Sequence, residues 1–74
     1  MNISKQVGAN LKYARKLLGK TQSQVASLML MTQQQYSRFE NGLFELNYEQ
    51  ILKLCKILDT TPNEIFSVDN NNFN

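Results

Sequence analysis

The sequence has no histidine and a single cysteine, Cys55. A zinc site with histidine ligands is therefore excluded, and one thiol can supply neither a cysteine-rich zinc site nor an intramolecular disulfide. A chain without disulfides suits a reducing compartment, so we expect a cytoplasmic protein. No pair of acids has a spacing that suits a reactive cleft, and we expect no catalytic residues, no metal and no cofactor.

Long apolar runs are also missing. None approaches the roughly 20 residues of a transmembrane helix, and the N-terminus lacks the basic-then-apolar pattern of a secretory signal. The chain shows neither the alternating runs typical of strands nor an internal repeat. Its 74 residues allow one domain with a modest core. We expect an all-α domain over residues 1–66 and a flexible, Asn-rich polar tail over 67–74.

Charge is unevenly distributed along the chain, although the net charge is only +2. Residues 1–38 contain six lysines and arginines and no acid, whereas residues 39–74 contain two lysines and six acids. Such asymmetry between halves indicates a surface that meets a polyanion. The alternative is a basic face that only contacts solvent.

Helix starts are marked four times by a capping side chain three residues before Gln or Glu. The four pairs are Thr21 and Gln24, Thr32 and Gln35, Asn47 and Gln50, and Thr61 and Glu64. Each pair can satisfy two backbone N–H groups that have no partner within the helix. After a first helix of about 4–18, the pattern predicts helices of about 21–29, 32–40, 47–58 and 61–66. Gly19 and Gly42 are expected to end helices.

Apolar residues at helical spacing predict the inner faces. In the first helix they are Ile3, Val7, Leu11, Ala14 and Leu18. In the others they are Val25, Ala26, Met29, Tyr36, Phe39, Ile51, Leu54, Cys55, Leu58, Ile65 and Phe66. We expect Cys55 to behave as a small buried hydrophobic residue.

Three consecutive glutamines, Gln33 to Gln35, open the helix expected after Thr32. A carboxamide donates and accepts at once, which suits the N6/N7 edge of adenine in the major groove of DNA. This helix start is therefore a candidate base reader. The alternative is a solvated helix surface, and Gln35 is alternatively occupied by its capping role.

The run TQSQVASLMLMTQQQYSRFENG (21–42), followed by ILKLCKIL and TPNEIF, resembles the Cro/CI-type (XRE) helix-turn-helix family. The resemblance covers roughly residues 3–66. It implies a compact five-helix, lambda-repressor-like fold. It also implies a sequence-specific transcriptional regulator, expected to be a repressor, that binds a two-fold symmetric operator in double-stranded DNA as a homodimer.

The same resemblance implies roles for individual residues. Base contacts fall on the third helix, at Gln33, Gln34, Ser37 and Arg38. Arg38 would bind either guanine or only a phosphate. Phosphate contacts fall on Gln22, Thr32 and Asn41.

Two of these residues also have a structural role or alternative, and the resemblance adds one structural pair. Gln22 would in addition support Gln33, and the alternative for Asn41 is a helix C-cap. Arg15 and Glu40 match a structural ion pair of the family.

Two segments depart from the family pattern. Leu30 stands where the turn usually has glycine, so we expect the turn to be rearranged or strained. The loop after the third helix, Leu43 to Leu46, is acidic and apolar where the family is usually basic. Leu43 and Phe44 either fold back onto the core or form a dimer contact. This loop would be the working face in an alternative function, a protein-interaction module of antirepressor or antitoxin-like type.

Overall fold

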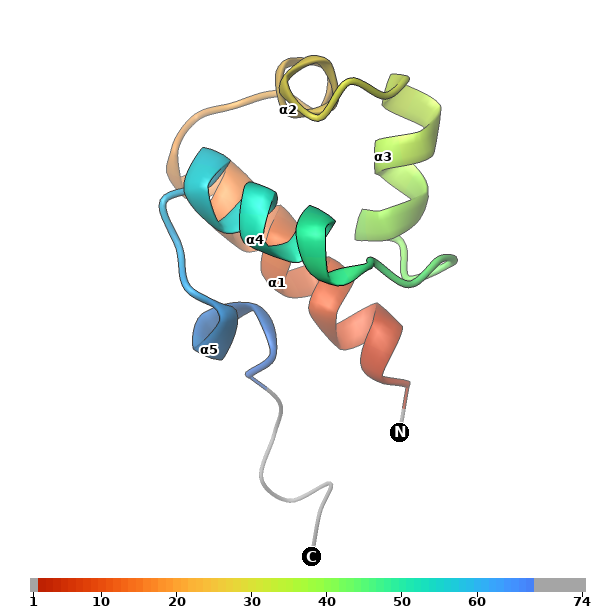
Figure 1. Cartoon of the computed structure of the whole chain (residues 1–74), viewed down its shortest axis with the longest axis vertical. Helices are drawn as coiled ribbons and strands as arrows, with labels where there is room; N and C mark the ends of the chain where they lie inside the picture. Colours follow the sequence, from red (N-terminus) through yellow and green to blue (C-terminus); the bar gives the residue numbers. More distant parts are fainter. Residues whose placement is uncertain (1, 68–74) are drawn as a thin grey trace, which may run out of the picture.

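The computed structural model describes residues 2–67, which form five α-helices and, within that range, no strand (Figure 1). The helices are α1 (Ile3–Leu17), α2 (Gln22–Leu28), α3 (Gln33–Glu40), α4 (Tyr48–Ile57) and α5 (Pro62–Ile65). The predicted all-α, five-helix class is confirmed. Of the predicted polar tail, only Ser67 lies within the described residues. Over the same range, none of the helices combines the length and apolar character that crossing a bilayer requires.

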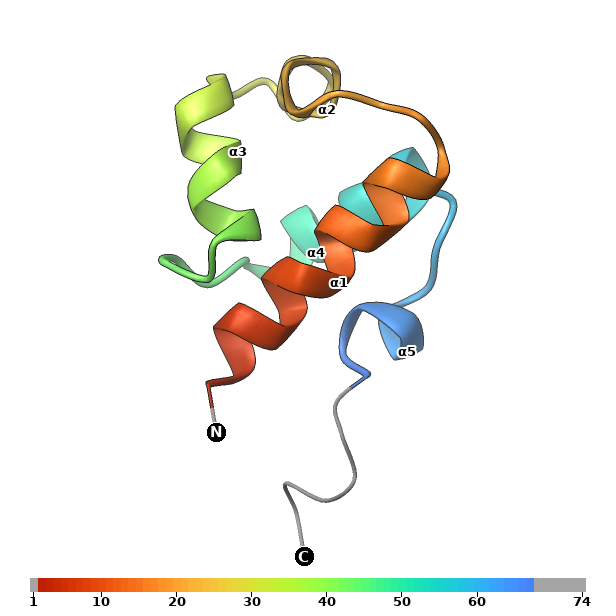
Figure 2. The same cartoon turned by 180° about the vertical axis from the view of Figure 1, so that it is seen from behind.

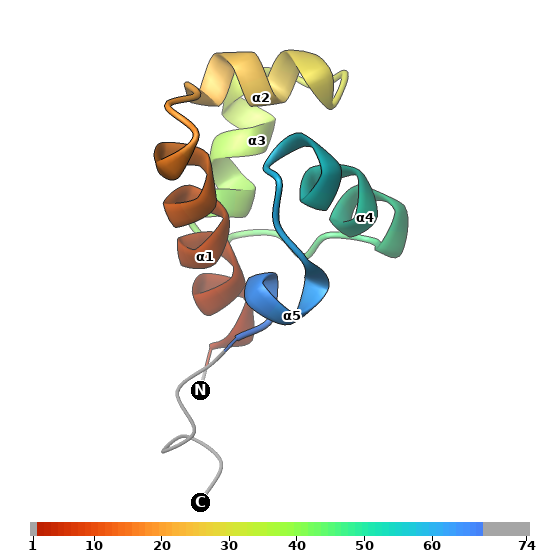
Figure 3. The ribbon, with the colours of Figure 1, turned by 90° about the vertical axis from the view of Figure 1, so that its left-hand side faces the viewer.

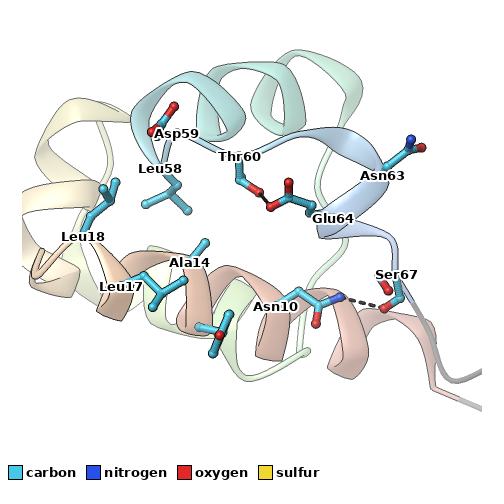
Figure 4. A pocket seen from close by; sticks show the side chains of 11 residues that line it. Asn10, Ala14, Leu17, Leu18, Leu58, Asp59, Thr60, Asn63, Glu64 and Ser67 are labelled. Atoms are coloured by element: carbon cyan, nitrogen blue, oxygen red, sulfur yellow. Dashed lines mark hydrogen bonds between the residues drawn. The ribbon is translucent and has the colours of Figure 1, made fainter.

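Capping side chains set the helix starts, as predicted, and each cap lies one residue outside its helix. The boxes led by Thr21, Thr32 and Asn47 are reciprocal: each cap accepts from the third helical N–H, and each glutamine accepts from the N–H of its cap. In the fourth expected capping box, the bond to the cap side chain is present, but the predicted bond from the cap N–H to the Glu64 side chain is wrong. Thr61 accepts from the Glu64 N–H at 3.3 Å. The Glu64 carboxylate instead accepts from the Thr60 hydroxyl at 2.8 Å, because that donor lies one turn before it (Figure 4).

The helices enclose one core, and α1 packs against both α3 and α5. In Figure 2, α1 crosses the front of the molecule, with α3 on one side and α5 on the other. Figure 3 shows α2 lying across the same end of the molecule as the first turn of α3. Every helix contributes to the core. Its buried apolar residues are Val7, Leu11, Val25, Ala26, Met29, Tyr36, Ile51, Leu54, Cys55, Leu58 and Ile65.

Asn10 fixes the end of α5 on α1. Its side-chain amide donates to the carbonyl oxygens of Ile65 and Ser67, both at 2.8 Å. Figure 4 shows the bond to Ser67. Ile65 is the last residue of a four-residue helix, whose final backbone acceptors have no partner within the helix, and Ser67 follows its C-cap, Phe66. One polar side chain of α1 therefore takes over a capping role for a helix more than 50 positions away in the chain.

Three residues expected on inner faces are exposed. Ile3, Leu18 and Phe66 keep 52%, 43% and 46% of their surface accessible, and the prediction for them is wrong. Ile3 and Leu18 lie at the two ends of α1, and Phe66 directly follows α5. Helical spacing assigns a residue to a face, but a residue at a helix end is buried only if a neighbouring element extends that far.

Gly8 allows α1 and α3 to approach closely. A Cβ at this position would lie 2.5 Å from the Phe39 carbonyl oxygen and 2.7 Å from the Glu40 carbonyl carbon. Both are backbone atoms, so they cannot move aside as the end of a flexible side chain can. The close approach brings the C-terminal turn of α3 against α1, where Glu40 contacts Arg15.

The turn between α2 and α3 keeps its left-handed residue although that residue is not glycine. Leu30 has φ +58°, so the turn is strained and not rearranged. Its side chain is 87% exposed and gains little by packing. The position therefore imposes a backbone cost with almost no side-chain compensation.

We expect Leu30→Gly to leave the protein more stable. A left-handed conformation costs an L-residue about 1–2 kcal/mol, which glycine avoids. Glycine in turn loses more backbone entropy on folding, which offsets about 0.5–1 kcal/mol of this gain. The free energy of unfolding should therefore rise by about 0.5–1 kcal/mol, measured by urea titration. Leu28→Gly, at a half-exposed helical position, should lower it instead. A loss of stability in Leu30→Gly would show that the leucine side chain makes a contact that matters.

Candidate nucleic-acid interface

The first turns of α2 and α3 meet, which brings together residues about ten positions apart. Gln22 and Gln33 are the first residues of the two helices. The Gln33 amide nitrogen donates to Gln22 Oε1 over a long 3.5 Å. The Ser23 hydroxyl donates to Gln33 Oε1 at 3.2 Å. Gln22 thus lies beside Gln33, as the resemblance implies.

A buried ion pair lies behind this contact. Arg15 Nε and Nη2 donate to the two oxygens of Glu40 at 2.7 and 3.1 Å, the two-pronged geometry that suits a guanidinium and a carboxylate. Their side chains are 10% and 1% exposed. Arg15 Nη1 also donates to the Lys20 carbonyl at 2.9 Å, and Gln22 Nε2 donates to Glu40 Oε1 at 3.0 Å. The predicted pair is therefore present, and it is connected to the surface through Gln22.

The environment of Glu40 keeps it ionised. Burial by itself would raise the pKa of this carboxyl, but the hydrogen bonds from Arg15 and Gln22 outweigh burial and hold the pKa below its ordinary value. Burial and the nearby Glu40 charge together raise the pKa of Tyr36. The Tyr36 hydroxyl is buried and makes no hydrogen bond within residues 2–67. Tyr36 therefore remains a neutral core residue.

The outer side of α3 holds the remaining residues expected to contact bases. Gln34 is exposed, and its amide has no hydrogen bond in the described part of the chain. Ser37 is half-buried and accepts from the Asn41 amide at 3.4 Å. The Arg38 guanidinium lies 5.7 Å from the centre of the Phe44 ring, within the range of a cation–π contact. Gln34 is the least constrained of these side chains.

Two expected contact residues cap α3, and a third is occupied within its capping box. Thr32 is the N-cap and accepts from the Gln35 N–H at 3.1 Å, while Gln35 Oε1 accepts from the Thr32 N–H at 2.9 Å. Gln35 is thus engaged in capping, the alternative considered from the sequence. Asn41 is the C-cap of the same helix. Gly42 follows with φ +74°, and a Cβ there would lie 2.6 Å from Lys5 Cα.

The loop after α3 is only partly folded back. The Phe44 ring packs edge-on against Phe39, with centroids 6.4 Å apart, yet it remains 52% exposed. Leu43 is 66% exposed, whereas Leu46 packs against the core. Phe44 also lines a groove with Ile3, Phe66 and side chains of α3, α4 and the loop between them. The fold thus leaves an apolar surface beside α3.

No group of three or more His, Cys, Asp or Glu side chains suitable for a metal ion occurs among residues 2–67. Cys55 is a buried free thiol of the α4 inner face, and burial raises its pKa above the ordinary value. A raised pKa keeps the thiol protonated and poorly nucleophilic. These observations are consistent with a structural role for Cys55.

Sequence reasoning did not identify two residues of this region. Ser23 carries no signal in periodicity or capping, and only the packing of α2 on α3 brings it to Gln33. Gly8 could have been noticed, because an isolated glycine inside a helical pattern often marks a close backbone contact.

Comparison with known protein families gives one match. A family model described as helix-turn-helix matches residues 11–65, most of the chain. The matched part runs from the middle of α1 to the end of α5 and includes the meeting of α2 and α3 described above. Comparisons with curated proteins and with solved structures gave no match.

Proposed function

Since the chain belongs to the helix-turn-helix family, of the Cro/CI type, we propose that it is a sequence-specific repressor that reads double-stranded DNA with α3. The family consists of DNA-binding regulatory domains and is not an enzyme family. In this architecture the second helix of the motif enters the major groove, with its first residues at the base edges. Repression, the operator and the individual contacts are the parts that we propose.

The observation that carries the proposal is the pair of exposed amides at the start of α3. Gln33 is anchored to α2, and Gln34 is unconstrained beside it. We assign base contacts to these two residues, and to Ser37 and Arg38 one turn further along. Arg38 would exchange its contact with the Phe44 ring for a guanine or a phosphate.

Phosphate contacts are assigned to both ends of α3. Gln22 and Thr32 lie at its start, and Asn41 lies at its end. Eight residues at 1.5 Å each make α3 about 12 Å long, which is about the width of the major groove. The first turns of α2 and α3 contain no acid, so the positive ends of both helix dipoles are available to phosphates.

We further propose that two copies bind one operator, with α3 helices about one helical turn, roughly 34 Å, apart. The apolar surface at Leu43 and Phe44 supports this part of the proposal. Exposed apolar side chains beside a reading helix are suited to contact a second copy. Glu45, which follows Phe44 in the chain, is exposed, and its negative charge makes this loop a poor phosphate ligand.

Selection of bound sites from random DNA tests the function. We expect a two-fold symmetric site with half-sites one turn apart. Affinity for it should fall steeply with salt, by about a thousandfold between 50 and 200 mM if a dimer neutralises about six phosphates. A scrambled duplex should bind weakly, with most of its affinity lost over the same range.

Absence of any selected sequence, or binding that does not respond to salt, would contradict this function. It would favour the alternative, a protein-interaction module that uses the exposed surface at Leu43 and Phe44. Such a contact buries apolar area and is much less sensitive to salt than a contact with phosphates.

A further inference from the structure

Ser23 has no role in the function proposed above. It is the second residue of α2, it is exposed, and its hydroxyl donates to Gln33 Oε1 at 3.2 Å. This is the shorter of the two hydrogen bonds of the Gln33 amide, since the bond from Gln33 Nε2 to Gln22 Oε1 measures 3.5 Å. Ser23 is thus the nearest polar partner of a side chain to which we assign a base contact.

Glu40 determines how the side-chain amides of Gln22 and Gln33 are oriented. An ionised carboxylate only accepts hydrogen bonds, so Gln22 must turn its Nε2 towards Glu40, at 3.0 Å. Gln22 Oε1 then faces outwards, and an amide oxygen also only accepts. Gln33 must therefore turn its own Nε2 towards Gln22. The buried charge determines, through one intermediate side chain, which way the Gln33 amide faces.

Ser23 stabilises this direction from the other side. With Nε2 turned towards Gln22, the Gln33 oxygen faces Ser23, which donates to it. A carboxamide has two N–H groups and two lone pairs on its oxygen. After both contacts, Gln33 retains one N–H and one lone pair, the pair of groups that adenine N7 and N6 require.

We propose that Ser23 is a specificity-determining positioning residue, which holds the Gln33 amide in the orientation that reads an A·T pair. The inference rests on the proposed function. Ser23 acts through Gln33 and gives no sequence information of its own. Its removal should therefore change the choice of base more than the overall strength of DNA binding.

The test is the ratio of affinities for two duplexes. One is the selected operator, and the other has G·C in place of A·T at the pair whose preference Gln33→Ala abolishes. We expect Ser23→Ala to lower this ratio by about threefold to tenfold, which corresponds to the net free energy of one hydrogen bond. In a Gln33→Ala background, Ser23→Ala should leave the ratio unchanged, because the two residues act as one unit.

Ser27→Ala is the matched control. Ser27 is exposed on the same helix, and its hydroxyl makes no hydrogen bond within the described chain, so the ratio should stay at the wild-type value. Thermal unfolding of each variant shows that the fold is retained.

Two results would overturn the inference. Equal weakening of Ser23→Ala on both duplexes would mean that Ser23 only contacts a phosphate, and an unchanged affinity for both would mean that it does not orient Gln33. Either result overturns the inference alone, whereas a wild-type chain that selects no sequence overturns the proposed function and the inference with it.

Discussion

Replacing Arg15 by alanine is expected to lower the free energy of unfolding by about 3–5 kcal/mol. The substitution leaves the Glu40 carboxylate buried, with Gln22 as its remaining hydrogen-bond donor. A domain of 74 residues lies at the low end of the usual total stability of about 5–15 kcal/mol, so the variant should retain only a small part of the wild-type value. Urea titration of wild type and variant measures the difference.

Two further variants make this result specific. Lys16→Ala removes an exposed cation one residue further along α1 and should change stability by less than about 0.5 kcal/mol. The double variant Arg15→Met with Glu40→Leu removes both charges and should be more stable than Arg15→Ala, because no charge is left unpaired. A loss below about 1 kcal/mol in Arg15→Ala would place the pair among ordinary surface pairs.

The same pair makes stability depend on pH. The pKa of Glu40 is lower in the folded protein than its ordinary value of 4.5. A depressed carboxyl pKa contributes stability above the ordinary value and loses that contribution as the pH falls towards the folded value. The wild-type protein should therefore lose stability in acid below about pH 4.5. The Arg15→Met, Glu40→Leu variant should show a smaller loss over the same range.

The second large effect is expected on recognition of DNA. The double substitution Gln33→Ala with Arg38→Ala should reduce discrimination between the selected operator and its mismatched variants by about 1–3 kcal/mol for each contact that is lost. Binding to unrelated DNA should change much less, because it depends on phosphates. Competition titrations with matched and mismatched duplexes at one fixed salt concentration measure both quantities.

Asn41→Ala provides the contrast to this variant. Asn41 caps the far end of α3, where we assign a phosphate contact, so its removal should weaken binding to all duplexes about equally. If the Gln33 and Arg38 variant kept full discrimination, within about 1 kcal/mol, α3 would not be the reading helix. Arg38→Ala also removes the contact with Phe44. The free energy of unfolding of the variant shows how much of its effect on binding is a loss of stability.

Much of the fold could be predicted because its signals are local. A threonine or asparagine three residues before glutamine satisfies the same backbone groups wherever it occurs, so the starts of α2, α3 and α4 follow from the sequence. The burial of Tyr36 and Leu54 likewise follows from the helical spacing of apolar residues alone. Where a nearby competitor existed, as Thr60 does for Glu64, the local rule failed.

The candidate site was predictable to a smaller extent. The chemistry of the amides indicated the glutamines that open α3, whereas the role of Arg38 and the pairing of Arg15 with Glu40 came from resemblance to a family and not from a physical signal in the chain. Periodicity cannot show that Arg15 meets Glu40, because 25 positions separate them. The exposure of Leu43 and Phe44 remained open in the sequence, because a loop has no periodicity from which a face can be assigned.

The sequence by itself determined where the helices begin, which stripes of α1 and α4 face inwards, and that glutamines open α3. Each of these depends on residues within about four positions of one another. The tertiary structure decided that Gly8 brings α3 against α1, that Glu40 is buried, and that Ser23 meets Gln33. These contacts depend on how helices cross, which is set by the packing of the whole core and by no local segment.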